Sequence, residues 1–148
     1  MAVRVTMERF DPGAETNAFL AAAGGAGAAV TFTGLVRSTP DLPVTTLTLE
    51  CYPELAINQL DALIDDANAR FDLLAATILH RYGVLQVGEP IVQVMTLSAH
   101  RGAAFQGAEF LMDYLKTDAP FWKQETGPQG TNWVEAHDAD DAARARWK

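Results

Sequence analysis

The sequence predicts an α+β protein, and three observations lead to this class. Apolar and polar residues alternate over 3–7 and 44–52, a pattern typical of half-buried strands. An apolar stripe at spacings of three and four follows over 53–71, which is typical of a helix. The predicted strands and helices do not alternate with a regular βαβ period, so a doubly wound parallel sheet is disfavoured. We expect one domain over 1–148, with antiparallel strands and a C-terminal hairpin.

The composition excludes several classes of protein. A chain of 148 residues that is 49% hydrophobic and 20% charged is typical of a soluble domain with its own core. The net charge of −8 would repel nucleic acid and anionic membranes, so an anionic ligand needs a local basic pocket. No apolar run approaches the roughly 20 residues of a membrane span, and the N-terminus lacks a signal-peptide pattern. With Cys51 as its one cysteine, the chain has no internal disulfide, which fits the cytoplasm.

The N-terminal third predicts strand, helix and strand. After the strand at 3–7, Asp11-Pro12-Gly13 indicates a turn, and 14–23 is expected to be a short helix. The glycine cluster at 24–27 lacks the lysine and hydroxyl of a phosphate-binding loop and precedes a strand, so a flexible turn is the better interpretation. A β-branched and aromatic strand is predicted at 28–36. The polar segment 38–43, with its prolines, predicts a mobile loop.

The middle of the chain predicts a strand followed by a helix. In the strand at 44–52, Leu47, Leu49 and Cys51 share one face, so Cys51 is expected to be a packed thiol and not a nucleophile. Pro53 suits the first turn of the helix that follows. The stripe of this helix consists of Ala56, Leu60, Leu63, Ile64, Ala67 and Phe71. Three aspartates take the outer face, where a solvated surface is expected: Asp61, Asp65 and Asp66.

The C-terminal half predicts two more strands, a helix and a hairpin. The strands are expected at 74–84 and 90–99, around the turn Gln86-Val-Gly-Glu89. A helix from about 103 to 117 would pack through Ala104, Ala108, Leu111 and Leu115, with Phe105 and Met112 beside them. A hairpin is predicted from 121–125 and 132–136, and a short helix after Asp138 carries its charges along the helix dipole.

Two lysines flank the end of the predicted helix at 103–117. Lys116 precedes Pro120 and Lys123 follows it, among the aromatic residues Tyr114, Phe121 and Trp122. Because proline disfavours helical geometry in the residue before it, the lysines do not share one helical face. The residues alone leave two interpretations open. The lysines either cover aromatic surface while keeping their charges in water, or they form a cationic site for an anionic substrate.

The other basic residues worth collecting are Arg37, His80, Arg81, His100, Arg101 and His137. Several are predicted at the ends of strands and helices, where functional side chains are often presented. His100 and Arg101 open a helix, whose backbone N–H groups favour anions. The three histidines have no zinc-binding spacing, and no serine lies in a nucleophile elbow. If this is an enzyme, its nucleophile is expected to come from the substrate or from a partner.

Six segments, in order and spread over nearly the whole chain, match a known pattern. They are Val30-Thr-Phe-Thr-Gly-Leu-Val-Arg37, Leu47-Thr-Leu-Glu-Cys-Tyr52, His80-Arg-Tyr-Gly83, Ser98-Ala-His-Arg101 with Ala104-Phe105, Met112-Asp-Tyr-Leu-Lys-Thr-Asp-Ala-Pro-Phe-Trp-Lys-Gln-Glu125 and Trp133-Val-Glu-Ala136. Each segment is a weak signal, but their order and spacing are highly specific. Together they resemble the MoaE family, the large catalytic subunit of molybdopterin synthase.

The resemblance implies an α/β hammerhead fold and a sulfurtransferase of molybdenum cofactor biosynthesis. Such enzymes convert cyclic pyranopterin monophosphate to molybdopterin by installing two dithiolene sulfurs. The sulfur comes from a C-terminal thiocarboxylate on a small ubiquitin-like partner subunit, whose Gly-Gly tail enters the pocket of the large subunit. A homodimer of the large subunit within a heterotetramer is implied, as is a cytoplasmic location. No metal, resident cofactor, nucleic acid or membrane is expected.

The resemblance also implies roles for individual residues. Lys116 and Lys123 would be the catalytic lysines. Arg37, His100 and Arg101 would bind the pterin and its phosphate, the last two from the other protomer. Phe32 and Met112 would line the pocket.

We expect Lys116 at the reacting centre, because a helix holds it rigidly and apolar neighbours would favour its neutral amine. Lys123 would hold the tail or the phosphate. His137 departs from the family pattern, which has an arginine there, and its charge as a substrate-binding residue would depend on pH. The alternatives are a non-catalytic anion-binding or partner-docking module on the same fold, and a phosphate-ester hydrolase, for which no metal cluster or nucleophile elbow is present.

Overall fold

The computed structural model describes residues 2–134 and 138–148. The elements follow one another as β1 (Val3–Thr6), α1 (Pro12–Ala21), β2 (Ala28–Leu35), β3 (Thr46–Glu50), α2 (Pro53–Phe71), β4 (Ala75–Arg81), β5 (Gly83–Gln86), β6 (Pro90–Ser98), α3 (Arg101–Thr117), β7 (Trp122–Gly127), β8 (Gly130–Val134) and α4 (Asp138–Ala145). Helices and strands are mixed without a βαβ repeat, which confirms the predicted α+β class and the C-terminal hairpin.

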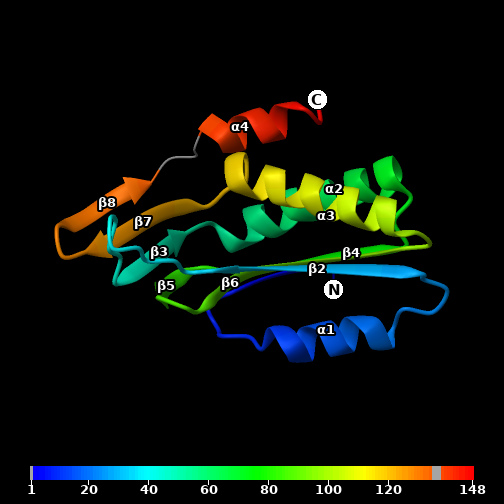
Figure 1. Ribbon diagram of the computed structural model, residues 1–148, viewed down its shortest axis with the longest axis horizontal. Helices are drawn as coiled ribbons and strands as arrows, with labels where there is room; N and C mark the ends of the chain where they lie inside the picture. The colour runs from blue at the N-terminus through cyan, green and yellow to red at the C-terminus, as the bar shows by residue number, and fades with distance from the viewer. Residues whose placement is uncertain (1, 135–137) are drawn as a thin grey trace.

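The larger sheet lies between two layers of helices. Its strand order is β1-β4-β6-β2, with β1 parallel to β4 and the other pairs antiparallel. Figure 1 shows α1 on one face of this sheet and α2 and α3 on the other. The central strand β6 is buried from Val92 to Ser98 because helices cover both of its faces.

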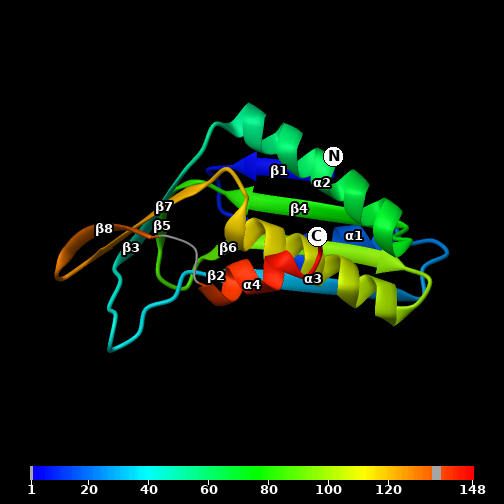
Figure 2. The same cartoon turned by 90° about the horizontal axis from the view of Figure 1, so that it is seen from above.

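The smaller sheet is wholly antiparallel, in the order β5-β3-β7-β8, and lies at one end of the larger sheet (Figures 1 and 2). Its strands have two different faces. Leu47, Leu49 and Leu85 are buried on one face, whereas Trp122 and Trp133 are exposed. The predicted hairpin therefore forms the outer half of this sheet.

The single strand predicted at 74–84 is wrong, because the chain passes there from one sheet to the other. β4 ends at Arg81 and pairs with β1 and β6, whereas β5 begins at Gly83 and pairs with β3. Gly83 has a φ of 91°, a conformation that side chains with a Cβ rarely adopt. The start of α1 also differs from the prediction: the Asp11 carboxylate caps the helix by accepting from the N–H groups of Gly13 and Ala14.

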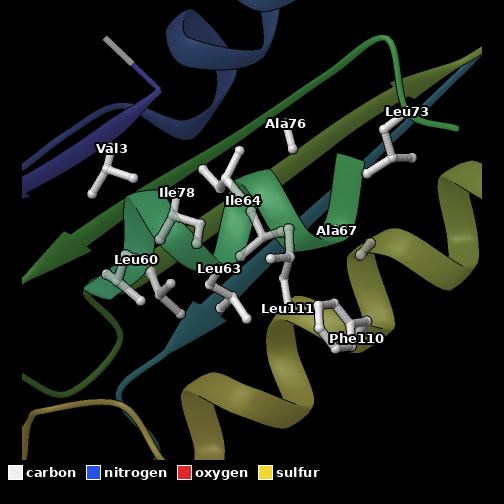
Figure 3. Close-up of a cluster of buried hydrophobic side chains, with 13 residues drawn as sticks. Val3, Leu60, Leu63, Ile64, Ala67, Leu73, Ala76, Ile78, Phe110 and Leu111 are labelled. Atoms are coloured by element: carbon white, nitrogen blue, oxygen red, sulfur yellow. The ribbon is translucent and has the colours of Figure 1, made fainter. Parts of the chain in front are cut away.

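The main core lies between the larger sheet and its pair of helices. Five members of the predicted α2 stripe are buried: Ala56, Leu60, Leu63, Ile64 and Ala67. Figure 3 shows most of them with Val3 and Ile78 of the sheet and Phe110 and Leu111 of α3. Phe105 was expected beside the packing face of α3, but it is 60% exposed. Phe110 takes the buried position, because it lies on the side of α3 that meets Phe71 of α2.

The C-terminal helix α4 and the residues after it are held against α3. Trp147 packs edge-on against Phe71 and Phe110, with ring centroids 5.4 and 5.6 Å apart. Its Nε1 donates to the Asp113 carboxylate, 2.7 Å away, and Arg146 pairs with the same carboxylate at 2.8 Å. These contacts fix α4 next to the C-terminal end of α3. Within the described residues, no helix is both long enough and apolar enough to cross a membrane.

Candidate functional site

A cavity of about 670 Å³ opens where the C-terminal end of α3 meets the two sheets. Its lining comes from β2 and the loop after it, from β3, from the end of β4 and from the stretch between Met112 and Glu125. Val36, Leu47 and Leu49 belong to a small buried apolar cluster along one wall. The volume is that of a ligand pocket, and its lining combines an apolar wall with charged groups.

Lys116 and Lys123 both line this cavity, as the sequence predicted, and they reach it from different elements. Lys116 lies in the last turn of α3. The helix then ends, with the N–H of Asp118 donating to the carbonyl of Tyr114. Lys123 lies on β7, where it pairs with Leu49 of β3 and Val134 of β8. Because the chain turns at Pro120, Lys116 and Lys123 line the same cavity although they are seven residues apart in the chain.

Lys123 is the more buried of the two lysines, although the burial of an ammonium group was expected first at Lys116. The side chain of Lys123 is 39% exposed, and Lys116 is classed as exposed. Burial lowers the pKa of Lys123, and the charge of Lys116 lowers it further. The carboxylates of Glu125, at 4.0 Å, and Asp140 oppose these effects. Both acids also line the cavity, and the sequence analysis had singled out neither.

Three more of the predicted site residues lie in the same cavity: Phe32, Met112 and Arg37. Phe32 is 39% exposed, and Met112 is half-buried beside the core. Arg37 follows the end of β2 and is exposed. The cavity therefore joins a guanidinium and two ammonium groups to an aromatic ring and a thioether.

His100 and Arg101 do not join the cavity of their own chain. They are exposed at the N-terminus of α3, whereas Lys116 is in its last turn, about 22 Å away at 1.5 Å per residue. His137 lies outside the described residues. The structure thus brings together five of the eight predicted site residues in one chain.

His80 lines the cavity, although the sequence analysis assigned it no role. Its side chain is buried, and its ring is stacked on Phe121 with centroids 3.9 Å apart and planes 14° from parallel. Burial lowers the pKa of His80 to about 4, so the ring is neutral near pH 7. A histidine at the end of the apolar alternation of Ala76 and Ile78 was the signal available in the sequence.

The charged groups of the described lining are three cations and two acids. No cluster of histidine, cysteine, aspartate and glutamate suited to a metal occurs in residues 2–134 or 138–148. Cys51 is half-buried, and burial raises the pKa of its thiol, which disfavours the thiolate. The arrangement can bind an anion and stabilise negative charge that develops during a reaction.

Known proteins similar to this chain have closely related names. The family model described as MoaE protein matches residues 5–118. A molybdopterin synthase catalytic subunit from Cereibacter sphaeroides is 47% identical, over 99% of this chain and 100% of the relative. The corresponding protein of Pseudomonas aeruginosa is 48% identical, over 100% and 99%. The solved molybdopterin cofactor biosynthesis protein E from Burkholderia multivorans superposes with a TM-score of 0.82, at 44% identity, over 99% of this chain and 95% of that one.

Proposed function

The chain belongs to the MoaE family, and we propose that it is the catalytic subunit of a molybdopterin synthase in molybdenum cofactor biosynthesis. The observation that carries this proposal is the meeting of Lys116, Lys123 and Arg37 in one cavity. In a chain with a net charge of −8, this local excess of cations is suited to a small anionic substrate. The substrate we propose is cyclic pyranopterin monophosphate.

The sulfur is proposed to come from a partner, because the thioether of Met112 is the one sulfur in the described lining of the cavity and it is not a transferable thiol. The described lining contains no cysteine or serine. A thiocarboxylate at the end of a small ubiquitin-like subunit would supply the nucleophile, on a Gly-Gly tail narrow enough to enter. The thiocarboxylate and the phosphate are both anions, and their desolvation in the cavity has to be offset by the lysines and Arg37.

The proposed reaction has two steps in which negative charge develops. The thiocarboxylate sulfur forms a bond to carbon of the pterin side chain while the bond from that carbon to a phosphate oxygen breaks. Water then attacks the resulting thioester through an oxyanion, which releases the partner's carboxylate and leaves sulfur on the pterin. Fixed cations lower the barrier of both steps because they are in place before the charge appears.

The burial of Lys123 changes the catalytic roles that we assign to the two lysines. A half-buried ammonium stabilises a nearby anion more strongly than an exposed one, because less water screens it. A lowered pKa also makes it a better proton donor to a leaving oxygen. We therefore assign Lys123 to the reacting centre together with Lys116, and not only to holding the tail or phosphate.

A second copy of the chain is proposed to complete the site. His100 and Arg101 are too far from the lysines of their own chain to share a ligand with them. In a homodimer, a partner protomer could present the N-terminus of its α3 to this cavity, which would add a cation and helical N–H groups for the phosphate. His137 is proposed as a further phosphate contact. With a small subunit on each protomer, the assembly is a heterotetramer, and we place it in the cytoplasm.

One reaction tests the proposal directly. The protein is mixed with the thiocarboxylated partner and cyclic pyranopterin monophosphate, and the dithiolene product is measured. We expect product with the unchanged chain, and we expect Lys116→Ala to lose the chemical step by orders of magnitude while it still binds the partner. Absence of dithiolene from the complete mixture would leave only a docking or anion-binding module.

A further inference from the structure

His80 lies at the point where the main core gives way to the cavity. On β4, Ala76, Ile78 and His80 point to the same face, because side chains alternate along a strand. Ala76 and Ile78 belong to the core beneath α2 and α3. His80 is 7% exposed in the next position of this row, where the pattern calls for an apolar residue. A polar ring at that position needs a reason, because burying it without full pairing is unfavourable.

A hydrogen bond to the backbone fixes the orientation of the His80 ring. Its Nδ1 is 2.8 Å from the carbonyl oxygen of Arg81, so Nδ1 carries the proton and donates it. The position of Arg81 is fixed in turn, since its guanidinium donates to Glu89 at 2.8 Å and to the carbonyl of Met7 at 3.0 Å. The imidazole is therefore held as a flat, neutral surface whose plane cannot turn freely.

Phe121 lies on this surface, two residues before Lys123 in the chain. The two rings are nearly parallel, with centroids 3.9 Å apart. The N–H of Phe121 donates to the carbonyl of Ala119, which closes the turn after α3. Phe121 immediately precedes β7 and Lys123 is the second residue of that strand, and both line the cavity. A shift of the backbone at Phe121 would therefore change where β7 starts and where Lys123 lies.

We propose that His80 is a positioning residue for Lys123: its fixed imidazole seats Phe121, and this stack holds Lys123 half-buried beside Lys116. The two stacked rings line the same cavity as Lys123, and in this proposal they limit the access of water to its side chain. The neutral ring adds no further positive charge to a cavity that already holds Lys116, Lys123 and Arg37. The catalytic consequence rests on the proposed function, but the positioning is measured without any turnover.

The titration of Lys123 reports its position. Lys116, Lys123 and Lys148 are the lysines of the chain, so ¹³C-methylation of the lysines gives few resonances, which Lys→Arg variants assign. Among residues 2–134 and 138–148, the charged groups that line the cavity with Lys123 are Lys116, Arg37, Glu125 and Asp140. All of them remain in the variants below, so a changed midpoint reports a changed exposure of Lys123 to water.

Four variants separate positioning from other roles of the imidazole. In His80→Ala, water replaces the ring, and the Lys123 midpoint is expected to rise toward the ordinary lysine value of about 10.4. Phe121→Ala removes the other ring of the stack and is expected to raise the Lys123 midpoint in the same way. This second variant tests the proposal even if His80→Ala does not fold. His80→Phe keeps the stack and is expected to keep the low midpoint. Thr77→Val, on the opposite face of β4, is the matched control and is expected to change nothing.

The outcomes are distinguishable from a failure of the proposed function. Unchanged Lys123 midpoints in both folded alanine variants would overturn the proposal, even if the enzyme made product. So would a folded His80→Phe variant with the raised midpoint, because a flat ring stacked on Phe121 would then not be what holds Lys123. If turnover is obtained, His80→Ala is expected to lower kcat by up to about 100-fold with little change in KM, as a displacement of about 1 Å at a catalytic group can do. His80→Phe is expected to restore kcat.

Discussion

Removal of the Lys123 ammonium should slow the chemical step far more than it weakens binding of the partner. A unit charge about 4 Å from a developing oxyanion is worth about 1 kcal/mol in water and about 4 kcal/mol near a protein surface. The Lys123 side chain is 39% exposed and lies in a cavity with an apolar wall, which places it closer to the second case. Because about 1.4 kcal/mol changes a rate tenfold, we expect Lys123→Ala to lose about 100- to 1,000-fold.

The assay is single turnover with saturating thiocarboxylated partner, which isolates the chemical step from product release. Partner affinity is measured in parallel, and it should change little, because one lysine contributes a small part of such an interface. Lys148→Ala removes an exposed lysine at the end of the chain and serves as the matched control. A Lys123→Ala variant that retains more than about a fifth of the rate would refute the reasoning, since the loss would then be that of a charge screened by water.

Four further predictions follow from the same structure. If Lys123 acts as a cation, the rate of the reaction falls as the pH rises through the lowered pKa of Lys123. In Lys123→Arg this fall should occur at a higher pH in the pH–rate profile, because arginine keeps its charge. Glu89 has a pKa lowered chiefly by its hydrogen bond from Arg81. The contribution of Glu89 to the free energy of unfolding is therefore fully present above the ordinary glutamate pKa, and it is lost as the pH falls through the lowered pKa. Urea unfolding at several pH values should show a weaker pH dependence of this free energy in Glu89→Gln. Leu60→Ala, at a fully buried position, should lower the free energy of unfolding by about 2–5 kcal/mol in the same measurement. His137→Arg should bind the cyclic pterin phosphate at least as well at pH 8 in calorimetry, and weaker binding would reject a phosphate contact.

The elements were predictable from the sequence where one local signal decided them. The α2 stripe gave the buried face of that helix, because helical periodicity alone determines which residues face the core. Pro120 gave the end of α3 and the separation of the two lysines for an equally local reason. The split of 74–84 into β4 and β5 was missed, because the two halves are separated by their pairing with distant strands. Nothing in that run except Gly83 marks the change.

The candidate site also has a part that was predictable from the sequence and a part that was not. The two lysines, Arg37, Phe32 and Met112 were predicted as a group from motifs, and the fold places all five in one cavity. Their surroundings were not predictable. The stack of His80 on Phe121 joins residues 41 positions apart, and Asp140 reaches the cavity from a helix beyond the hairpin. Such contacts depend on how the two sheets and α4 are placed, which no local pattern specifies.

The acids in the cavity explain how two ammonium groups can share it before a substrate arrives. Burial and the charge of Lys116 both lower the pKa of Lys123, and both effects disfavour its charged form. Glu125 and Asp140 oppose both effects from within the cavity. Both carboxylates raise the pKa of Lys123 and so favour its charged form. The 4.0 Å separation between Lys123 and Glu125 is longer than a strong ion pair, so an entering anion can replace this contact. The Lys123 ammonium is therefore not engaged in a tight ion pair within the cavity and is available to bind an anion.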